Sequence, residues 1–297
     1  MDVKKYKLVE NIGKGQFGSI FKGINKKTGE QVAIKVESSQ QHLVKLLKNE
    51  TTIVNYLHAH GSRNIPNIIW FGTLDRIDTS SYFNLETQHK DYLALIMPLY
   101  ECSLYEYKNI KIGLSYDHVT SIMVQAINIL ESIHSNFVIH RDIKPDNFMI
   151  KKGELFLIDF GFSTFYVNSE KQHITMDCSH QSIIGTPKYV SIFIHDGVRY
   201  SRRDDLISLG YILIFLFLGD KSRQNKIQSD MECSHIMHPI NQELKKEKSL
   251  DNIENLYKSE FPQIYYYLKT CYDMHYYECP DYTFLKEIFL QTTKKMI

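Results

Sequence analysis

Apolar residues in the first hundred positions come in short runs that are bounded by glycine and polar turns. The runs at residues 31–36 and 93–97 have the length of β-strands. Residues 43–57 differ, because their apolar positions recur near helical spacing while Lys and Asn fall between them. The pattern therefore predicts a strand-rich segment that one helix interrupts.

The pattern changes after residue 99 to longer helical segments, at residues 119–134, 206–218 and 282–293. The most apolar of these segments, residues 206–218, is too short to cross a bilayer. We therefore expect a buried core helix there and no membrane span.

These two halves predict an α+β fold with a small β-rich N-lobe, residues 1–97, and a larger α-helical C-lobe, residues 101–297. We place a hinge at residues 98–100, because an apolar strand stops there at Pro98, which cannot continue a hydrogen-bonded ladder. Residues 1–297 then form a single domain, and the polar residues 75–91 are interpreted as an insertion of unknown purpose.

Charge and tyrosine content argue against a nucleic-acid-binding protein. The 35 basic and 34 acidic residues leave a net charge of +1, so no global field favours nucleic acid, and we expect no direct binding to it. Tyrosines cluster at residues 265–267 and 276–277, where packing is a better explanation than base stacking.

Five scattered cysteines without a Cys-x-x-Cys pair favour a reducing compartment over a disulfide framework or a zinc site. The first residues are polar and lack the apolar stretch of a secretory signal, and Asp2 excludes N-myristoylation. We expect a cytoplasmic, intracellular protein. The helices show no exposed heptad, and a monomer is expected.

The most specific motif is His-Arg-Asp-Ile-Lys-Pro-Asp-Asn at residues 140–147, followed by Asp-Phe-Gly at residues 159–161. Phosphoryl transfer needs a carboxylate to orient a hydroxyl, for which Asp142 is the candidate, and Lys144 is the candidate to neutralise phosphate charge. Asn147 and Asp159 are candidate magnesium ligands, since magnesium prefers oxygen donors. A surface turn would explain Asp146 and Asn147 alone, but not an Asp159 that directly follows an apolar strand.

Residues 13–18, Gly-Lys-Gly-Gln-Phe-Gly, form a glycine-rich pattern between two expected strands. Glycines let backbone amides approach phosphate oxygens, so we expect nucleotide contacts from Gly13, Lys14, Gly15, Gln16, Phe17 and Gly18. The pattern also marks dinucleotide folds and ordinary hairpins. A strand rather than a helix follows it, at residues 19–23, which disfavours a Rossmann fold.

Lys35 ends the apolar run Val-Ala-Ile-Lys. A solvated lysine is the default interpretation of one such residue. Glu50 in the following helix could pair with Lys35 and hold its ammonium against nucleotide phosphates, although Glu50 could equally face solvent.

Together these motifs resemble a eukaryotic-type protein kinase of the casein kinase 1 group. The group-level likeness comes from Gly-Thr-Pro-Lys-Tyr-Val-Ser-Ile at residues 185–192, where most protein kinases carry Ala-Pro-Glu, and from Ser-Arg-Arg-Asp-Asp-Leu at residues 201–206. Ile65-Pro66 before Trp70 and Pro280-Asp281-Tyr282 add to it. The compact form also resembles kinases of large cytoplasmic DNA viruses, for which host cytoplasm or virion would be the location.

The resemblance implies ATP and Mg²⁺, with Mn²⁺ as a substitute, and protein substrates phosphorylated on Ser or Thr. It implies that adenine lies among Ile12, Ile20, Ala33, Met97, Leu99 and Met149. It also implies that Asp205 braces the catalytic loop, and that Lys188 favours acidic or already phosphorylated sites.

Two departures and two rivals accompany the resemblance. Pro98 replaces an acidic hinge residue, and residues 220–226 lack the group's Pro-Trp pair. As is typical of the group, the hydroxyls after Phe160 are not expected to need phosphorylation. A pseudokinase scaffold is disfavoured because Lys35, Asp142 and Asp159 are all present. A small-molecule kinase is disfavoured by residues 185–192, which in protein kinases help build a peptide platform.

Overall fold

The computed structural model describes residues 2–14, 18–38, 41–74, 92–111, 113–178, 183–219 and 239–293. The expected insertion at residues 75–91, the segment at residues 220–226, and Gly15, Gln16 and Phe17 lie outside the described residues. The chain forms two compact units. The strand-rich unit comprises Met1–Gly61, Ile65–Glu101 and Ile158–Gly161, and the helical unit comprises Ser62–Asn64, Cys102–Leu157 and Phe162–Ile297. Strands dominate the first part of the chain and helices the rest, which confirms the predicted α+β fold.

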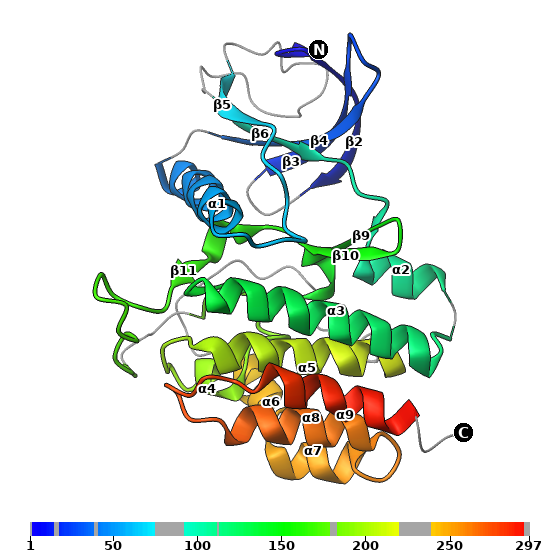
Figure 1. Ribbon diagram of the computed structural model, residues 1–297, viewed down its shortest axis with the longest axis vertical. Helices are drawn as coiled ribbons and strands as arrows, with labels where there is room; N and C mark the ends of the chain where they lie inside the picture. The colour runs from blue at the N-terminus through cyan, green and yellow to red at the C-terminus, as the bar shows by residue number, and fades with distance from the viewer. Residues whose placement is uncertain are drawn as a thin grey trace. The chain divides into compact units, whose positions relative to one another are not determined.

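The strand-rich unit is built on a six-stranded antiparallel sheet (Figure 1). Its strands in spatial order are β1 (Asp2–Val3), β2 (Tyr6–Lys14), β3 (Gly18–Asn25), β4 (Gln31–Ser38), β6 (Tyr92–Pro98) and β5 (Trp70–Leu74). Helix α1 (Gln41–Ala59) packs on β4 and β6. The helix predicted at residues 43–57 is therefore confirmed and is longer by a few residues at each end.

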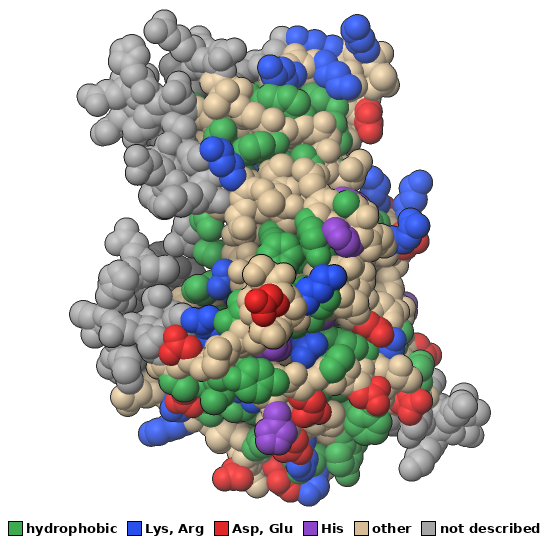
Figure 2. Space-filling model, turned by 60° about the vertical axis from the view of Figure 1, so that its left-hand side comes forward, with side chains coloured by type: hydrophobic (Ala, Val, Ile, Leu, Met, Phe, Trp, Pro, Cys, Tyr) green, Lys and Arg blue, Asp and Glu red, His purple; other side chains and the backbone are tan. Residues whose placement is uncertain are grey.

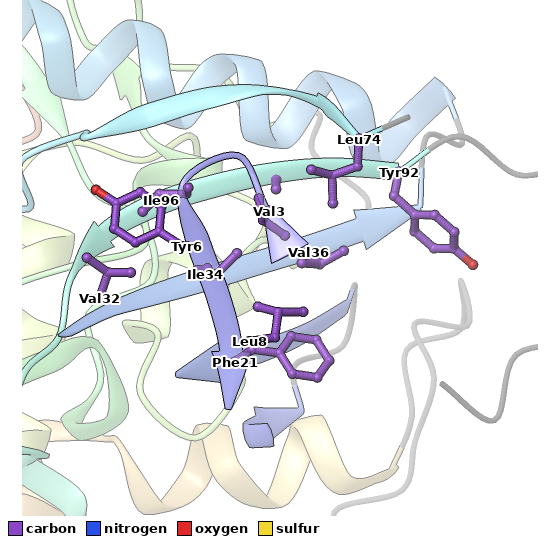
Figure 3. Close-up of a cluster of buried hydrophobic side chains, with 11 residues drawn as sticks. Val3, Tyr6, Leu8, Phe21, Val32, Ile34, Val36, Leu74, Tyr92 and Ile96 are labelled. Atoms are coloured by element: carbon purple, nitrogen blue, oxygen red, sulfur yellow. The ribbon is translucent and has the colours of Figure 1, made fainter. Parts of the chain in front are cut away.

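Side chains alternate between the two faces of β4, as the period of a strand requires. Val32, Ile34 and Val36 point into the cluster of buried hydrophobic residues shown in Figure 3, together with Tyr6, Phe21 and Ile96. Ala33 belongs to a second cluster that includes Leu47 of α1. By the same alternation Lys35 and Glu37 share the face of Ala33, which is the face that α1 covers.

Strand β6 is buried on both faces, so its sequence is continuously apolar rather than alternating. Ala94 and Ile96 belong to the first cluster, whereas Leu93, Leu95 and Met97 belong to the second. The strand ends at Pro98, as predicted from the missing N–H of proline.

The helical unit has long helices packed side by side (Figure 1). Its helices are α2 (Leu104–Ile110), α3 (Tyr116–Ser135), α4 (Ile192–His195), α5 (Arg202–Leu218), α6 (Pro239–Glu247), α7 (Leu250–Tyr257), α8 (Pro262–Asp273) and α9 (Tyr282–Thr293). Serine side chains cap the N-termini of α2, α3, α4 and α7 and satisfy backbone N–H groups that the helices leave unpaired.

Helix α5 is buried almost all round, as expected for residues 206–218. It contacts α3 and α8, and its start precedes the apolar stretch because Ser201 and Asp204 form a capping box. Leu206, Ile207, Ile212 and Leu216 have no exposed surface. No helix among the described residues is long and apolar enough to span a membrane.

Two small sheets complete the helical unit. One has the order β10 (Glu154–Leu157), β9 (Phe148–Lys151), β7 (Cys102–Ser103), and the other pairs β11 (Thr164–Phe165) with β8 (Val138–Ile139). Of the clustered tyrosines, Tyr265, Tyr267 and Tyr276 are buried and fit the packing interpretation, whereas Tyr266 and Tyr277 are 52% and 50% exposed. On the face shown in Figure 2, basic and acidic side chains mix over the lower part, whereas basic side chains predominate over the upper part.

We expect Gly210→Ala to destabilise the helical unit. A Cβ at Gly210 would lie 2.3 Å from Cδ2 and 2.9 Å from Cγ of Leu268, and Leu268 is fully buried. Overpacking of this kind costs about 1–3 kcal/mol, which exceeds or offsets the roughly 1 kcal/mol that alanine gains over glycine in a helix.

Thermal and urea denaturation would measure the change. Lys269→Ala, at an exposed position of α8, is the control and is expected to change the free energy of unfolding by no more than about 0.5 kcal/mol. A Gly210→Ala protein more stable than wild type would contradict the expectation.

Candidate active site

Lys35 lies at the centre of a group of carboxylates in the strand-rich unit. Its Nζ lies 3.1 Å from Glu50 Oε2, 3.1 Å from Asp159 Oδ1 and 3.5 Å from Glu37 Oε1. Glu50 comes from α1 and is almost fully buried, so it does not face solvent. Asn49 of the same helix donates to the carbonyl of Gly161 at 2.9 Å, which fixes the segment that carries Asp159.

One ammonium therefore faces three carboxylates. Burial lowers the pKa of Lys35, but the charges of Asp159, Glu50 and Glu37 outweigh that effect and raise it well above its ordinary value. Burial raises the pKa of Glu50 to about 7, and it also raises the pKa of Glu37. Glu37 Oε2 and Glu50 Oε1 are buried without a hydrogen-bond partner among the described residues. The group thus carries an excess of negative charge that a further cation would relieve.

The apolar residues expected around adenine are mostly brought together. Ala33 and Met97 are cross-strand partners in β4 and β6, and both lie in the second cluster of the strand-rich unit. Ile20 and Leu99 are half-buried and pack against the same cluster. Ile12 is 43% exposed on β2.

Gly13 and Gly18 flank the part of the glycine-rich pattern that is not described. The Gly13 N–H donates to Asn11 Oδ1 at 3.1 Å, and Lys14 pairs with Ser19 across β2 and β3. A Cβ at Gly18 would lie 2.1 Å from the carbonyl oxygen of Val36, so this position accepts only glycine.

Asp142 lies at the centre of a second polar group, which belongs to the helical unit. Its Oδ1 accepts hydrogen bonds from Thr186 N at 3.0 Å and Thr186 Oγ1 at 2.8 Å. Its Oδ2 accepts from Lys144 Nζ at 2.7 Å and Asn147 Nδ2 at 3.1 Å. Both oxygens of a buried carboxylate are therefore satisfied and held in one orientation.

Asn147 and Lys144 are oriented by the same contacts. Asn147 lies in the 3₁₀ turn Pro145–Asn147, and its Nδ2 also donates to the carbonyl of Asp142 at 2.8 Å. Since Nδ2 is directed to Asp142, Oδ1 is the atom of this amide that can bind a cation. Lys144 Nζ also donates to Thr186 Oγ1, at 3.3 Å.

The backbone of the 140–147 loop is held by Asp205 of α5. Asp205 Oδ2 accepts from His140 N at 2.7 Å, and Oδ1 accepts from Arg141 N at 2.9 Å. His134 Nε2 lies 3.1 Å from Oδ2, and its Nδ1 lies 2.7 Å from Tyr282 Oη. Burial would raise the pKa of Asp205, but the hydrogen bonds from His134 and His140 outweigh it and lower the pKa. The bracing expected of Asp205 is therefore present.

Strained backbone marks both polar groups. Arg141 and Asp159 have positive φ values, 71° and 66°, which non-glycine residues rarely adopt. Gly185 has φ 89°, and a Cβ there would lie 2.4 Å from the carbonyl oxygen of Arg141. Residues 141 and 185 can approach this closely only because position 185 lacks a side chain.

Sequence reasoning missed two participants. The position of Glu37 could have been predicted from the sequence, because Glu37 lies two residues after Lys35 on the same strand and so shares its face. Thr186 lies 44 residues from Asp142 in the chain, and no local sequence pattern reveals that it binds this carboxylate.

The remaining predicted residues have these places. Met149 lies in β9, opposite Ser103 and Phe156. Lys188 is half-buried, with Nζ 5.4 Å from the ring centroid of Tyr189.

A family model described as protein kinase domain matches residues 6–277, which is most of the chain. The matched region includes both polar groups and the glycine-rich pattern.

The contribution of His134 to the unfolding free energy is expected to fall as the pH drops below about 6.5. Burial lowers the pKa of His134, so the folded protein keeps it neutral where the unfolded chain, with a pKa of about 6.5, is protonated. At this residue the unfolded state then binds more protons, so acid lowers the part of the unfolding free energy that His134 contributes. His134→Gln should make the slope of unfolding free energy against pH less positive than in wild type.

Urea titrations between pH 5 and pH 8 would measure that slope, which is informative even if the variant is less stable overall. His275→Gln, which changes an exposed histidine, is expected to keep the wild-type slope. Equal slopes in His134→Gln and wild type would contradict the expectation.

Proposed function

Because this chain belongs to the protein kinase family, we propose that it is an active serine/threonine kinase that transfers the γ-phosphoryl group of ATP to protein hydroxyls. One observation carries the proposal. The buried carboxylate of Asp142 is held by Lys144, Asn147 and Thr186, so that a single side chain is fixed in position and orientation for work on a hydroxyl group.

Asp142 would accept a hydrogen bond from the acceptor hydroxyl and orient its oxygen toward the γ-phosphorus. As the new P–O bond forms, the bond from that phosphorus to the β–γ bridging oxygen breaks, and ADP leaves with the electron pair. The hydroxyl proton passes to the Asp142 carboxylate and then to solvent. Little covalent work falls to the protein, whose contribution is positioning and charge neutralisation.

Two lysines would supply positive charge to the phosphates. Lys144 is held beside Asp142 by its bonds to Oδ2 and to Thr186 Oγ1, which suits it to the transferred group. Lys35 is held by Glu50, so its ammonium is a fixed charge rather than a flexible one. Lys35 and Glu50 thus form a binding pair, and Asp142 and Lys144 act on the acceptor and the transferred group.

Asn147 and Asp159 fit magnesium in their chemistry, because each offers a hard oxygen donor. Among the described residues no group of three or more His, Cys, Asp or Glu is arranged to hold a metal. Magnesium in such enzymes takes one or two protein ligands and completes its shell with phosphates and water, so such a group is not needed. When bound, Mg²⁺ neutralises phosphate charge, and Mn²⁺ could substitute for it.

We also propose the nucleotide contacts. Ala33 and Met97, with Ile20 and Leu99 beside them, would contact adenine, as would Ile12 and Met149. Backbone groups of residues 13–18 would contact the phosphates. The proposal rests on the shared cluster of the first four residues and on the close approach that Gly18 permits.

The acceptor would be Ser or Thr, and the preferred sites acidic or already phosphorylated, as in the casein kinase 1 group. Lys144 and Thr186 support the acceptor type, since they occur with Asp142 in the arrangement that the group's sequence pattern implies. Lys188 supplies a positive charge two residues beyond Thr186. Both features are sequence likenesses to that group.

Asp142→Asn is expected to reduce kcat by about 10²–10⁴-fold, because an amide cannot accept the proton. The measurement is transfer of radiolabelled phosphate from ATP, with magnesium, to an acidic protein such as casein. Asp146→Asn, an exposed neighbour in the same loop, is the control and should keep wild-type activity.

Equal labelling by wild type and Asp142→Asn would contradict the proposal, and an inactive wild type that still binds partners would indicate a pseudokinase. Phosphorylation of sugars or aminoglycosides but no proteins would indicate a small-molecule kinase. Phosphoamino-acid analysis of the labelled protein should find phosphoserine and phosphothreonine without phosphotyrosine.

Lys188→Ala is expected to weaken the preference for acidic sites. A peptide pair that differs only by a phosphoserine or alanine near the acceptor would measure it, with kcat/KM as the readout. The ratio for the pair should fall by about 1.4- to 5-fold toward one, since an exposed or half-buried charge pair contributes about 0.2–1 kcal/mol. An unchanged ratio would assign the preference to other residues.

A further inference from the structure

Lys248 is a buried lysine whose ammonium bonds to neutral groups. It lies between α6 and α7, and only 4% of it is exposed. Its Nζ donates to the carbonyl oxygens of Pro187 and Val190, each at 2.7 Å, and to His195 Nε2 at 3.1 Å. Three N–H groups therefore meet three acceptors, which is the full capacity of an ammonium.

Other contacts complete this environment. Nζ lies 5.0 Å from the ring centroid of Tyr211 in α5, a favourable place for a cation. Burial lowers the pKa of Lys248 to about 7, although the charge of Glu247 opposes the shift. Burying an ammonium away from carboxylates carries a large desolvation penalty, which a solvent-exposed lysine at this position would avoid.

The two carbonyls belong to the turn that also carries Thr186. Within that turn the N–H groups of Tyr189 and Val190 bond to the carbonyl of Thr186, at 2.8 and 3.2 Å. Thr186 in turn gives two hydrogen bonds to the Asp142 carboxylate. A continuous chain of bonds thus joins Lys248 to Asp142 through residues 186–190.

A second anchor holds the other end of the turn. Ser191 Oγ donates to the buried carboxylate of Asp204 at 2.5 Å, and it also caps α4. Position 191 therefore fixes where the turn ends, whereas Lys248 is the group that holds the carbonyls inside it.

We propose that Lys248 is a positioning residue for phosphorylation of peptides, which it supports by fixing the 186–190 turn that holds Asp142 and borders the acceptor site. The inference rests on the proposed kinase function for its catalytic consequence. Its structural consequence, the rigidity of residues 186–195, does not depend on that function.

Hydrogen exchange followed by mass spectrometry tests the structural part. Lys248→Met should raise exchange at least tenfold in peptides covering residues 186–195 and leave α5 at the wild-type rate. Lys245→Met is the matched control, since Lys245 lies in α6, is half-exposed and pairs with Asp196. Lys248→Arg, which keeps a cation with several N–H donors, should restore part of the protection.

Steady-state kinetics test the catalytic part. Lys248→Met should lower kcat/KM for an acceptor peptide at least tenfold while KM for ATP stays within twofold. In the Thr186→Val background the same substitution should have less than a twofold effect, because Lys248 acts through the turn that Thr186 connects to Asp142.

Wild-type exchange in residues 186–195 of Lys248→Met would overturn the proposal, as would exchange that rises equally in α5. Independent, multiplicative effects in the double variant would also overturn it. If Lys248→Met does not fold, Lys248→Gln, which has two donors, is judged by the same criteria. A wild type that phosphorylates no protein would refute the kinase function, while the exchange data would still decide the role of Lys248.

Discussion

The buried carboxylate of Asp205 is the constraint on which the geometry of the 140–147 loop depends. A carboxylate without exposed surface is costly unless its oxygens are hydrogen-bonded, and here the backbone N–H groups of His140 and Arg141 meet that need together with His134. The favourable position of a negative charge in the first turn of α5 adds to this. These hydrogen bonds also compensate for the unfavourable positive φ of Arg141 and so fix the backbone position of the next residue, Asp142.

Much of the strand-rich unit could be predicted from local pattern. The apolar runs of β4 and β6, the helical spacing of α1 and the stop at Pro98 are all short-range signals, and each places a side chain on a definite face. The pairing of Lys35 with Glu50 follows from that placement, because strand period and helix period bring both residues to the interface of β4 and α1. The same strand alternation places Glu37, two residues after Lys35, on this interface as well.

The rest of the site depends on contacts between distant parts of the chain, which carry no local signal. Thr186 and Asp142, His134 and Tyr282, and Lys248 and Val190 are each more than forty residues apart in sequence. The family resemblance implied the role of Asp205. In the sequence, nothing distinguishes Lys248 from the other lysines near it. Only the packing of α4, α5 and α6 distinguishes it from its exposed neighbours.

The contact between Gly185 and the Arg141 carbonyl has a consequence for how such a chain can diverge. The Arg141 carbonyl oxygen occupies the space that a Cβ at position 185 would need, and the backbone at that position is left-handed. Any residue other than glycine would therefore be destabilised both by a steric clash and by backbone strain. Substitution of Gly185 is therefore excluded, whereas substitution of neighbouring surface residues is not. A natural variant that had lost this glycine would need a compensating shift of the histidine-arginine-aspartate segment, and sequences in which both have changed would mark lineages where the 140–147 loop has been remodelled.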